Sequence, residues 1–190
     1  MTHIDASQME YQQLNAEIQR CTENISITGC TGQRFIGAGL EHNHLTISGT
    51  PGNALGAYLN GACIEVHGNA QDAVGDTMNA GRIIVHGSIG DAAGYAMRGG
   101  EIYVEGNAGY RAGIHMKAYG DKLPAMVIGG RAGSFLGEYQ AGGVIIDREQ
   151  PSHRQQFPLY RHARRQTLSS FRLQRSSASQ TGDGAACHRR

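Results

Sequence analysis

The chain has 190 residues, long enough for one domain with a buried core, and it contains 28 glycines, only four prolines and a formal net charge of +1. This composition excludes a disordered linker rich in both residues, and the absence of a Gly-X-Y triplet repeat excludes a collagen-like helix. No stretch approaches the ~20 apolar residues of a membrane span and no basic-then-apolar signal opens the chain, so we expect a cytoplasmic protein without a membrane partner.

Residues 1–24 are predicted to form a short amphipathic helix that caps the rest of the fold. Ser7, followed three residues later by Glu10, is a capping-box pattern, in which both side chains satisfy free backbone N–H groups at a helix start. The apolar face of this helix is formed by residues at helical spacing, Tyr11, Leu14 and Ile18. We therefore expect a helix over about residues 8–20 that docks on a neighbouring element.

From residue 25 the helical period gives way to alternation and to a glycine triplet, G-x-x-G-x-x-x-G, that recurs at steps of 19 or 20 residues with one step of 24. One copy has Gln71 in place of its middle glycine, and the longer step indicates an insertion near residues 117–123. The glycines of these triplets are Gly49, Gly52, Gly56, Gly68, Gly75, Gly87, Gly90, Gly94, Gly106, Gly109, Gly113, Gly130, Gly133 and Gly137. Because glycine adopts positive φ and lets backbones approach closely, we interpret them as the corners of stacked coils.

Other positions repeat at the same step. An apolar-x-apolar pair precedes each leading glycine, as in Ile64 and Val66. A second apolar column consists of Leu59, Met78, Met97 and Met116. Short alternating strands joined by glycine corners are typical of a solenoid, in which each strand pairs with its copies ~4.8 Å above and below. The sequence therefore predicts an all-β parallel β-helix, a solenoid of coils of about 19 residues, over residues 25–146.

The glycines match no motif that binds a nucleotide phosphate. No triplet has the G-x-G-x-x-G spacing of a dinucleotide-binding loop, and Lys117 and Lys122, the only lysines, do not follow a glycine as a Walker loop requires. The four cysteines show no C-x-x-C spacing, which argues against a zinc knuckle or an Fe–S ligand set. We therefore expect no catalytic, cofactor-binding or metal-binding residues on this chain.

Histidines form the first remaining group with possible chemistry. His67 and His86 share one repeat column with Glu105, and such a ladder could bind a metal or hold a proton. A polar residue just before a corner glycine is more often solvated, and we favour that interpretation. His42 and His44 form a further pair without a third ligand at suitable spacing.

Acidic residues form the second group. Asp72, Asp91 and Tyr110 share a column, which leaves open a free-standing carbohydrate-active β-helix enzyme. Such an enzyme would need an acidic calcium cluster with basic residues on the same strand face. The basic candidates, Arg111 and Arg131, fall on other coils, so this function is kept only as an alternative.

The sequence resembles the C-terminal domain of the glutamate synthase large subunit, in the form of a stand-alone subunit. The stretches that carry the resemblance are "GQRFIGAGL", "GNALGAYLNG", "GDAAGYAMRGG", "GNAGYRAGIHMKAYG" and "GEYQAGGVII". One of the subunits of formylmethanofuran dehydrogenase is similar and has the same repeat. The resemblance covers about residues 4–146 and implies a right-handed parallel β-helix.

The resemblance also implies a function and a set of partners. The β-helix would carry no glutaminase cysteine, flavin or cluster, and would act as a non-catalytic scaffold. Its partners would be a glutamine amidotransferase subunit and a synthase subunit that holds FMN and Fe–S clusters. A scaffold in a formylmethanofuran dehydrogenase or formyltransferase complex is the alternative within the same class.

The pattern ends at Asp147. Residues 147–190 hold nine arginines against three acidic residues, with no lysine and no further repeat. A basic tail that binds nucleic acid is one interpretation, and a truncated or out-of-frame end is the one we favour. In either case the like charges and the lack of an apolar face predict a disordered segment.

Overall fold

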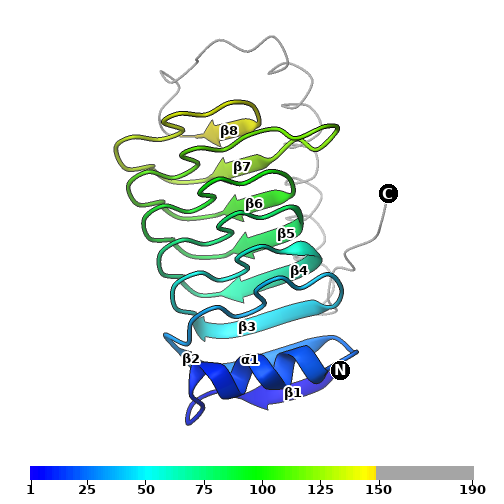
Figure 1. The fold of residues 1–190 in the computed structure, drawn as a ribbon. Helices are drawn as coiled ribbons and strands as arrows, with labels where there is room; N and C mark the ends of the chain where they lie inside the picture. The colour runs from blue at the N-terminus through cyan, green and yellow to red at the C-terminus, as the bar shows by residue number, and fades with distance from the viewer. Residues whose placement is uncertain (149–190) are drawn as a thin grey trace, which may run out of the picture. The chain divides into compact units, whose positions relative to one another are not determined.

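The computed structural model describes residues 1–148, and the expectations for residues 149–190 lie outside that part of the chain. Within it, eight parallel strands form a single sheet whose order is the order of the sequence (Figure 1). The elements are β1 (Thr2–Asp5), α1 (Tyr11–Arg20), β2 (Ile25–Thr31), β3 (His44–Thr50), β4 (Asn60–His67), β5 (Ala80–Val85), β6 (Glu101–Val104), β7 (Ala125–Ile128) and β8 (Val144–Asp147). This confirms the predicted all-β solenoid with coils of about 19 residues and one short helix.

The register of the sheet follows the sequence repeat. Ile64 pairs with Ile83, and Ile83 pairs with Ile102, so each strand lies directly over the equivalent strand of the preceding coil. A second, narrower ladder of single parallel bridges joins Ala70, Ile89, Ala108 and Ala132. Identical positions therefore stack on one another along the solenoid.

The core is the interior of the coils. Ile64 and Val66 face inward from β4 and are fully buried, while Glu65 between them faces outward. The second apolar column is also fully buried, as Leu59, Met78, Met97 and Met116. Burial of this kind stabilises by roughly 1.5–3 kcal/mol per large side chain, and it fixes which face of each strand is left for solvent.

The glycine triplets occupy two different structural environments. The third glycine of each triplet has φ between 63° and 68°, as at Gly113 (68°), in the left-handed region. The middle glycine instead lies against the previous coil: a Cβ added to Gly133 would meet the backbone of Gly109 and Tyr110 at 2.8–2.9 Å. The third position of the triplet therefore requires glycine for its left-handed backbone conformation, and the middle position requires glycine because successive coils approach closely there.

Each coil also has non-glycine residues with positive φ, which the sequence did not reveal. Ala54, Gly56 and Tyr58 have φ of 63°, 63° and 58° at alternate positions. Their N–H groups bond to alternate neighbours: Ala54 and Tyr58 donate to the next coil, at Asp72 and Asp76, and Gly56 donates to the preceding coil. The left-handed conformation costs about 1–2 kcal/mol per residue, and these inter-coil hydrogen bonds offset it.

The first residues differ from the prediction. The helix begins at Tyr11 after Glu10, which is extended and makes no side-chain cap, so the capping box was wrong. The backbone N–H of Ser7 instead donates to Asp5 Oδ1 at 3.0 Å. Residues 2–5 form β1, in register with β2, so a strand lies within the segment 1–24 that was predicted as a helix and cap.

The helix nevertheless packs as its apolar periodicity indicates. Leu14 and Ile18 are buried and belong to the same hydrophobic cluster as Ile4, Ile25 and Ile27. The α1 helix lies beside β1 and β2 at one end of the stack in Figure 1. Within residues 1–148 no helix is long and apolar enough to span a membrane.

The insertion between β6 and β7 lies where the longer step placed it. Tyr119 and Lys122 form an antiparallel bridge with two backbone hydrogen bonds of 3.0 and 3.2 Å, which closes a tight turn. The coils before and after the turn keep their register, because Ile102 still pairs with Met126. The extra residues are thus accommodated without disturbing the sheet.

Candidate functional site: a histidine and glutamate cluster on the outer sheet face

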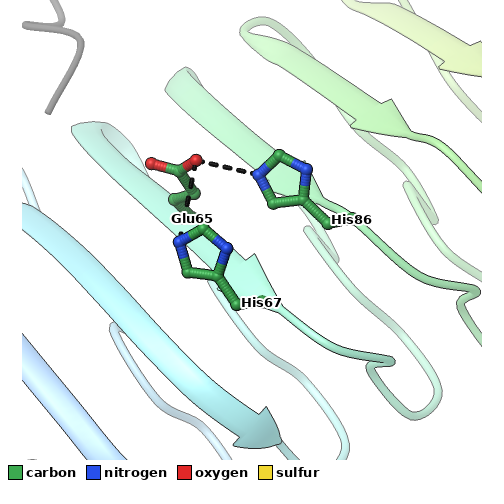
Figure 2. Close-up of side chains that lie close together, drawn as sticks. All are labelled: Glu65, His67 and His86. Carbon is green, nitrogen blue, oxygen red and sulfur yellow. Dashed lines mark hydrogen bonds and ion pairs between the residues drawn. The ribbon is translucent and has the colours of Figure 1, made fainter. Parts of the chain in front are cut away.

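The strongest candidate site is a group of side chains on the outer face of the sheet, here called the His/Glu cluster: Glu65, His67 and His86, with His44 and Glu105 beside them. Glu65 and His67 are alternate residues of β4, so both point away from the core. The backbone N–H of His86 donates to Val66 at 3.0 Å, which continues the ladder past β5 and sets His86 beside His67. Figure 2 shows the Glu65 carboxylate to one side of the two imidazole rings, with one of its oxygens directed at a ring nitrogen of each.

The carboxylate of Glu65 is the centre of the cluster. Its Oε1 lies 2.8 Å from His86 Nε2 and 3.9 Å from His67 Nε2, and its Oε2 lies 3.5 Å from His44 Nε2. The rings of His67 and His86 are stacked, with centroids 4.9 Å apart and an interplanar angle of 5°. Three imidazoles from β3, β4 and the end of β5 thus approach a single carboxylate.

A second carboxylate lies on the far side of His86. Glu105 Oε1 is 3.4 Å from His86 Nδ1, so both ring nitrogens of His86 face a carboxylate oxygen. Glu105 follows β6, and its N–H donates to Val85 at 3.0 Å, which fixes its place in the ladder. The imidazole is therefore oriented from both sides.

The proximity of acid and base shifts the pKa values in opposite directions. Hydrogen bonds from His44 and then from His86 hold the pKa of Glu65 well below its usual range, against the opposing effect of burial. The hydrogen bond to Glu65 raises the pKa of His86, and the charge of Glu105 adds to this effect. Without any further ligand, the cluster favours a charged carboxylate beside a protonated imidazole.

The cluster contains three residues that share one repeat column of the sequence, and two residues, Glu65 and His44, that lie in other columns. His67, His86 and Glu105 are neighbours on the outer face, as the repeat predicted: the two imidazole rings stack on each other, and Glu105 lies against His86. Glu65 adds a carboxylate that approaches both histidines. Glu65 was missed because its repeat column holds unlike residues, and only the strand alternation could have shown that it shares a face with His67. His44 was considered only as a partner of His42, and the structure separates that pair.

His42 lies outside the cluster. Its Nε2 is 4.0 Å from Glu41, and its side chain is 83% exposed. His44 Nε2, by contrast, faces Glu65 from the first residue of β3. The proposed pair therefore does not form one site.

The acidic column has a structural role in the inter-coil contacts. Asp72 Oδ1 accepts the N–H of Asp91 at 2.8 Å, and Asp91 Oδ1 accepts the N–H of Tyr110 at 2.7 Å. A parallel ladder uses Asn69, Ser88 and Asn107 in the same way. These side chains bond successive coils at the corners, which accounts for their repetition without a calcium site.

An exposed aromatic strip lies on the corner side of the later coils and consists of Tyr95, Arg111, His115, Phe135 and Tyr139. The His115 ring is stacked with Tyr139, with centroids 5.1 Å apart, and packs edge-on with Tyr95 at 5.6 Å. The Arg111 guanidinium lies 5.3 Å from the Phe135 ring centre. Phe135 and Tyr139 are 54% and 71% exposed, so this surface offers aromatic area to a partner.

Comparison with known proteins agrees with the repeat. The family described as the GXGXG motif matches residues 3–149. An uncharacterized protein of Methanocaldococcus jannaschii is 51% identical over 151 residues, a match that covers 75% of this chain and 58% of that protein. The chain thus spans less than two thirds of that relative, and no solved structure matches. With its glycine corners, stacked parallel coils and a match across nearly all of its described residues, the chain belongs to the GXGXG motif family, which includes the C-terminal domain of the large subunit of glutamate synthase.

Proposed function

We propose that this chain is a non-catalytic scaffold subunit of a cytoplasmic, glutamate synthase-like complex that forms glutamate from glutamine and 2-oxoglutarate. Its partners in this proposal are a glutamine amidotransferase subunit and a synthase subunit, and the synthase subunit holds the FMN and Fe–S clusters. The observation that carries the proposal is the family match over residues 3–149. It supports a comparison of this chain with a domain that in glutamate synthase is part of the large subunit.

The aromatic strip supports a role in assembly. Tyrosine, phenylalanine and arginine are enriched at the buried centres of protein interfaces, because they offer large contact areas at low entropic cost. Here they project from corners whose backbone is fixed by inter-coil hydrogen bonds, such as that from His115 N–H to Glu138 at 3.0 Å. A rigid platform of this kind loses little conformational freedom when a partner docks.

The proposal is tested by co-expression of the tagged chain with the amidotransferase and FMN/Fe–S subunits of the same genome, followed by size-exclusion chromatography. We expect one complex in which flavin absorbance elutes together with this chain. Elution of this chain apart from both subunits would overturn the proposal. Assembly with formyl-transfer subunits instead would support the alternative scaffold role.

A matched pair of variants tests whether the partner contacts the aromatic strip. Tyr139→Ala removes an exposed ring of the strip, and Tyr58→Ala removes a similarly exposed ring at the same corner position of an earlier coil. The two residues have nearly the same φ, 57° and 58°, so the backbone strain is matched. We expect Tyr139→Ala to weaken assembly at least tenfold and Tyr58→Ala to leave it unchanged, since interface aromatics cost roughly 1–4 kcal/mol when truncated.

A further inference from the structure

We propose that Glu65, His67 and His86 form a binding site for a divalent transition-metal ion, with Zn²⁺ as the best fit. One carboxylate and two imidazoles are a ligand set that holds zinc in proteins with a fourth position left open. The proposal rests on the outer sheet face alone and is independent of the function proposed above.

The positions of the ligand atoms support the site. One donor atom from each of the three residues lies within 4.8 Å of the other two. Ligand atoms on a tetrahedral zinc ion at 2.0–2.1 Å are about 3.3 Å apart, so the widest pair must close by roughly 1.5 Å. Rotation of side chains on a fixed strand supplies this shift, because the side chain of His67 is half exposed.

The surrounding side chains orient the ligands in the way that metal sites require. Glu105 lies 3.4 Å from His86 Nδ1, which directs Nε2 toward Glu65 and the proposed ion. A carboxylate behind a metal-binding histidine fixes the tautomer and raises the basicity of the ligand. His44, 3.5 Å from Glu65 Oε2, orients the carboxylate so that Oε1 faces the two rings.

The donor types select the class of ion. Two imidazole nitrogens favour zinc and its first-row neighbours over calcium and magnesium, which prefer sites made of oxygen ligands. Binding exchanges protons for the ion: any proton on the Nε2 atoms of His67 and His86 is released to solvent, and the Nδ1 proton of His86 stays directed at Glu105. The fourth ligand would be water or a group from a partner.

The alternative is a network of ion pairs that binds no metal, and titration distinguishes the two. The full-length protein is stripped with EDTA and titrated with ZnCl₂ by calorimetry, and with CoCl₂ by visible absorption, which reports four-coordinate ligand geometry. We expect the protein to bind one equivalent of Zn²⁺, and this binding to require the side chains of the His/Glu cluster. Glu65→Gln or His86→Gln should weaken this binding at least 100-fold, and Glu105→Gln should weaken it about 10–100-fold through the orientation of His86.

His42→Gln is the matched control, because His42 is an exposed histidine beside a glutamate but outside the cluster. It should bind Zn²⁺ like the parent, and unchanged circular dichroism should show that every variant is folded. Absence of Zn²⁺ binding in the parent would overturn the proposal. Equal affinities in the parent and Glu65→Gln would also overturn it, because the ion would then bind elsewhere.

Discussion

The close packing of successive coils predicts that Gly133→Ala is more destabilising than Gly39→Ala. An added Cβ at Gly133 would lie 2.8–2.9 Å from backbone atoms of Gly109 and Tyr110, where ordinary contact needs 3.4–4 Å. The coils must separate locally, which costs about 1–3 kcal/mol in overpacking. Separation also weakens the hydrogen bonds that Gly133 N–H donates to the carbonyl oxygens of Ala108 and Gly109, at 3.0 and 3.2 Å. This loss lowers the free energy of unfolding by about 1 kcal/mol more.

Gly39 isolates the effect of backbone conformation. Its φ is 68°, and no atom lies within 4 Å of an added Cβ, so Gly39→Ala incurs left-handed strain without a steric contact. We expect about 1 kcal/mol for this strain and roughly 2–4 kcal/mol for Gly133→Ala. At about 2–4 °C of melting temperature per kcal/mol, the difference is measurable by thermal denaturation followed by circular dichroism. Equal shifts for the two variants would refute the close approach of coils at Gly133.

Three further predictions concern separate parts of the fold. The first is measured in EDTA, without bound metal. Because the pKa of His86 is raised, the ion pair stabilises the native state below about pH 6.5, and this stabilisation is lost as pH rises. Because the pKa of Glu65 is lowered, its contribution is present above about pH 4.5 and is lost as pH falls. The free energies of unfolding of the parent and His86→Gln should therefore differ most between these pH values, by at most ~1 kcal/mol for a partly exposed pair. The difference is measured as melting temperatures across pH, and a difference independent of pH would contradict the ion pair. Asp91→Ala should cost about 0.5–1.5 kcal/mol in urea denaturation through the lost bond from Tyr110 N–H, and Asp91→Asn should cost less because it retains an acceptor. Leu14→Ala, in the fully buried face of α1, should cost roughly 2–5 kcal/mol in the same assay, and a cost under ~1 kcal/mol would show that the helix is not docked.

The repeat made most of the fold predictable. Columns such as Ile64, Ile83 and Ile102 repeat because identical positions stack, so the step in the sequence is also the register of the sheet. The first strand escaped prediction because only Ile4 of residues 2–5 is buried, which leaves too short a pattern to recognise. The false capping box at Ser7 shows that a short polar motif can serve a turn as well as a helix.

The site was less predictable, for a physical reason. Residues that recur are selected by the stacking of coils, whereas Glu65 and His44 occur once each in their columns and carry no periodic signal. Their proximity depends on how the strands pair and on which face of the sheet each residue occupies. His44 pairs with Cys63, two residues before Glu65, so the contact between His44 and Glu65 runs diagonally across β3 and β4 and requires the register of the sheet. The left-handed residues at Ala54 and Tyr58 were hidden for a similar reason, because neither residue type marks positive φ.

The most direct test of the proposed scaffold role is the formation of glutamate from glutamine and 2-oxoglutarate by the reconstituted amidotransferase and FMN/Fe–S subunits, measured with and without this chain. We predict that the purified chain alone contains no flavin and has no glutaminase activity, and that its addition at equal stoichiometry raises glutamate synthesis by the other two subunits at least tenfold. Equal rates of glutamate synthesis with and without this chain, or stoichiometric FMN in the purified chain, would contradict a non-catalytic scaffold role.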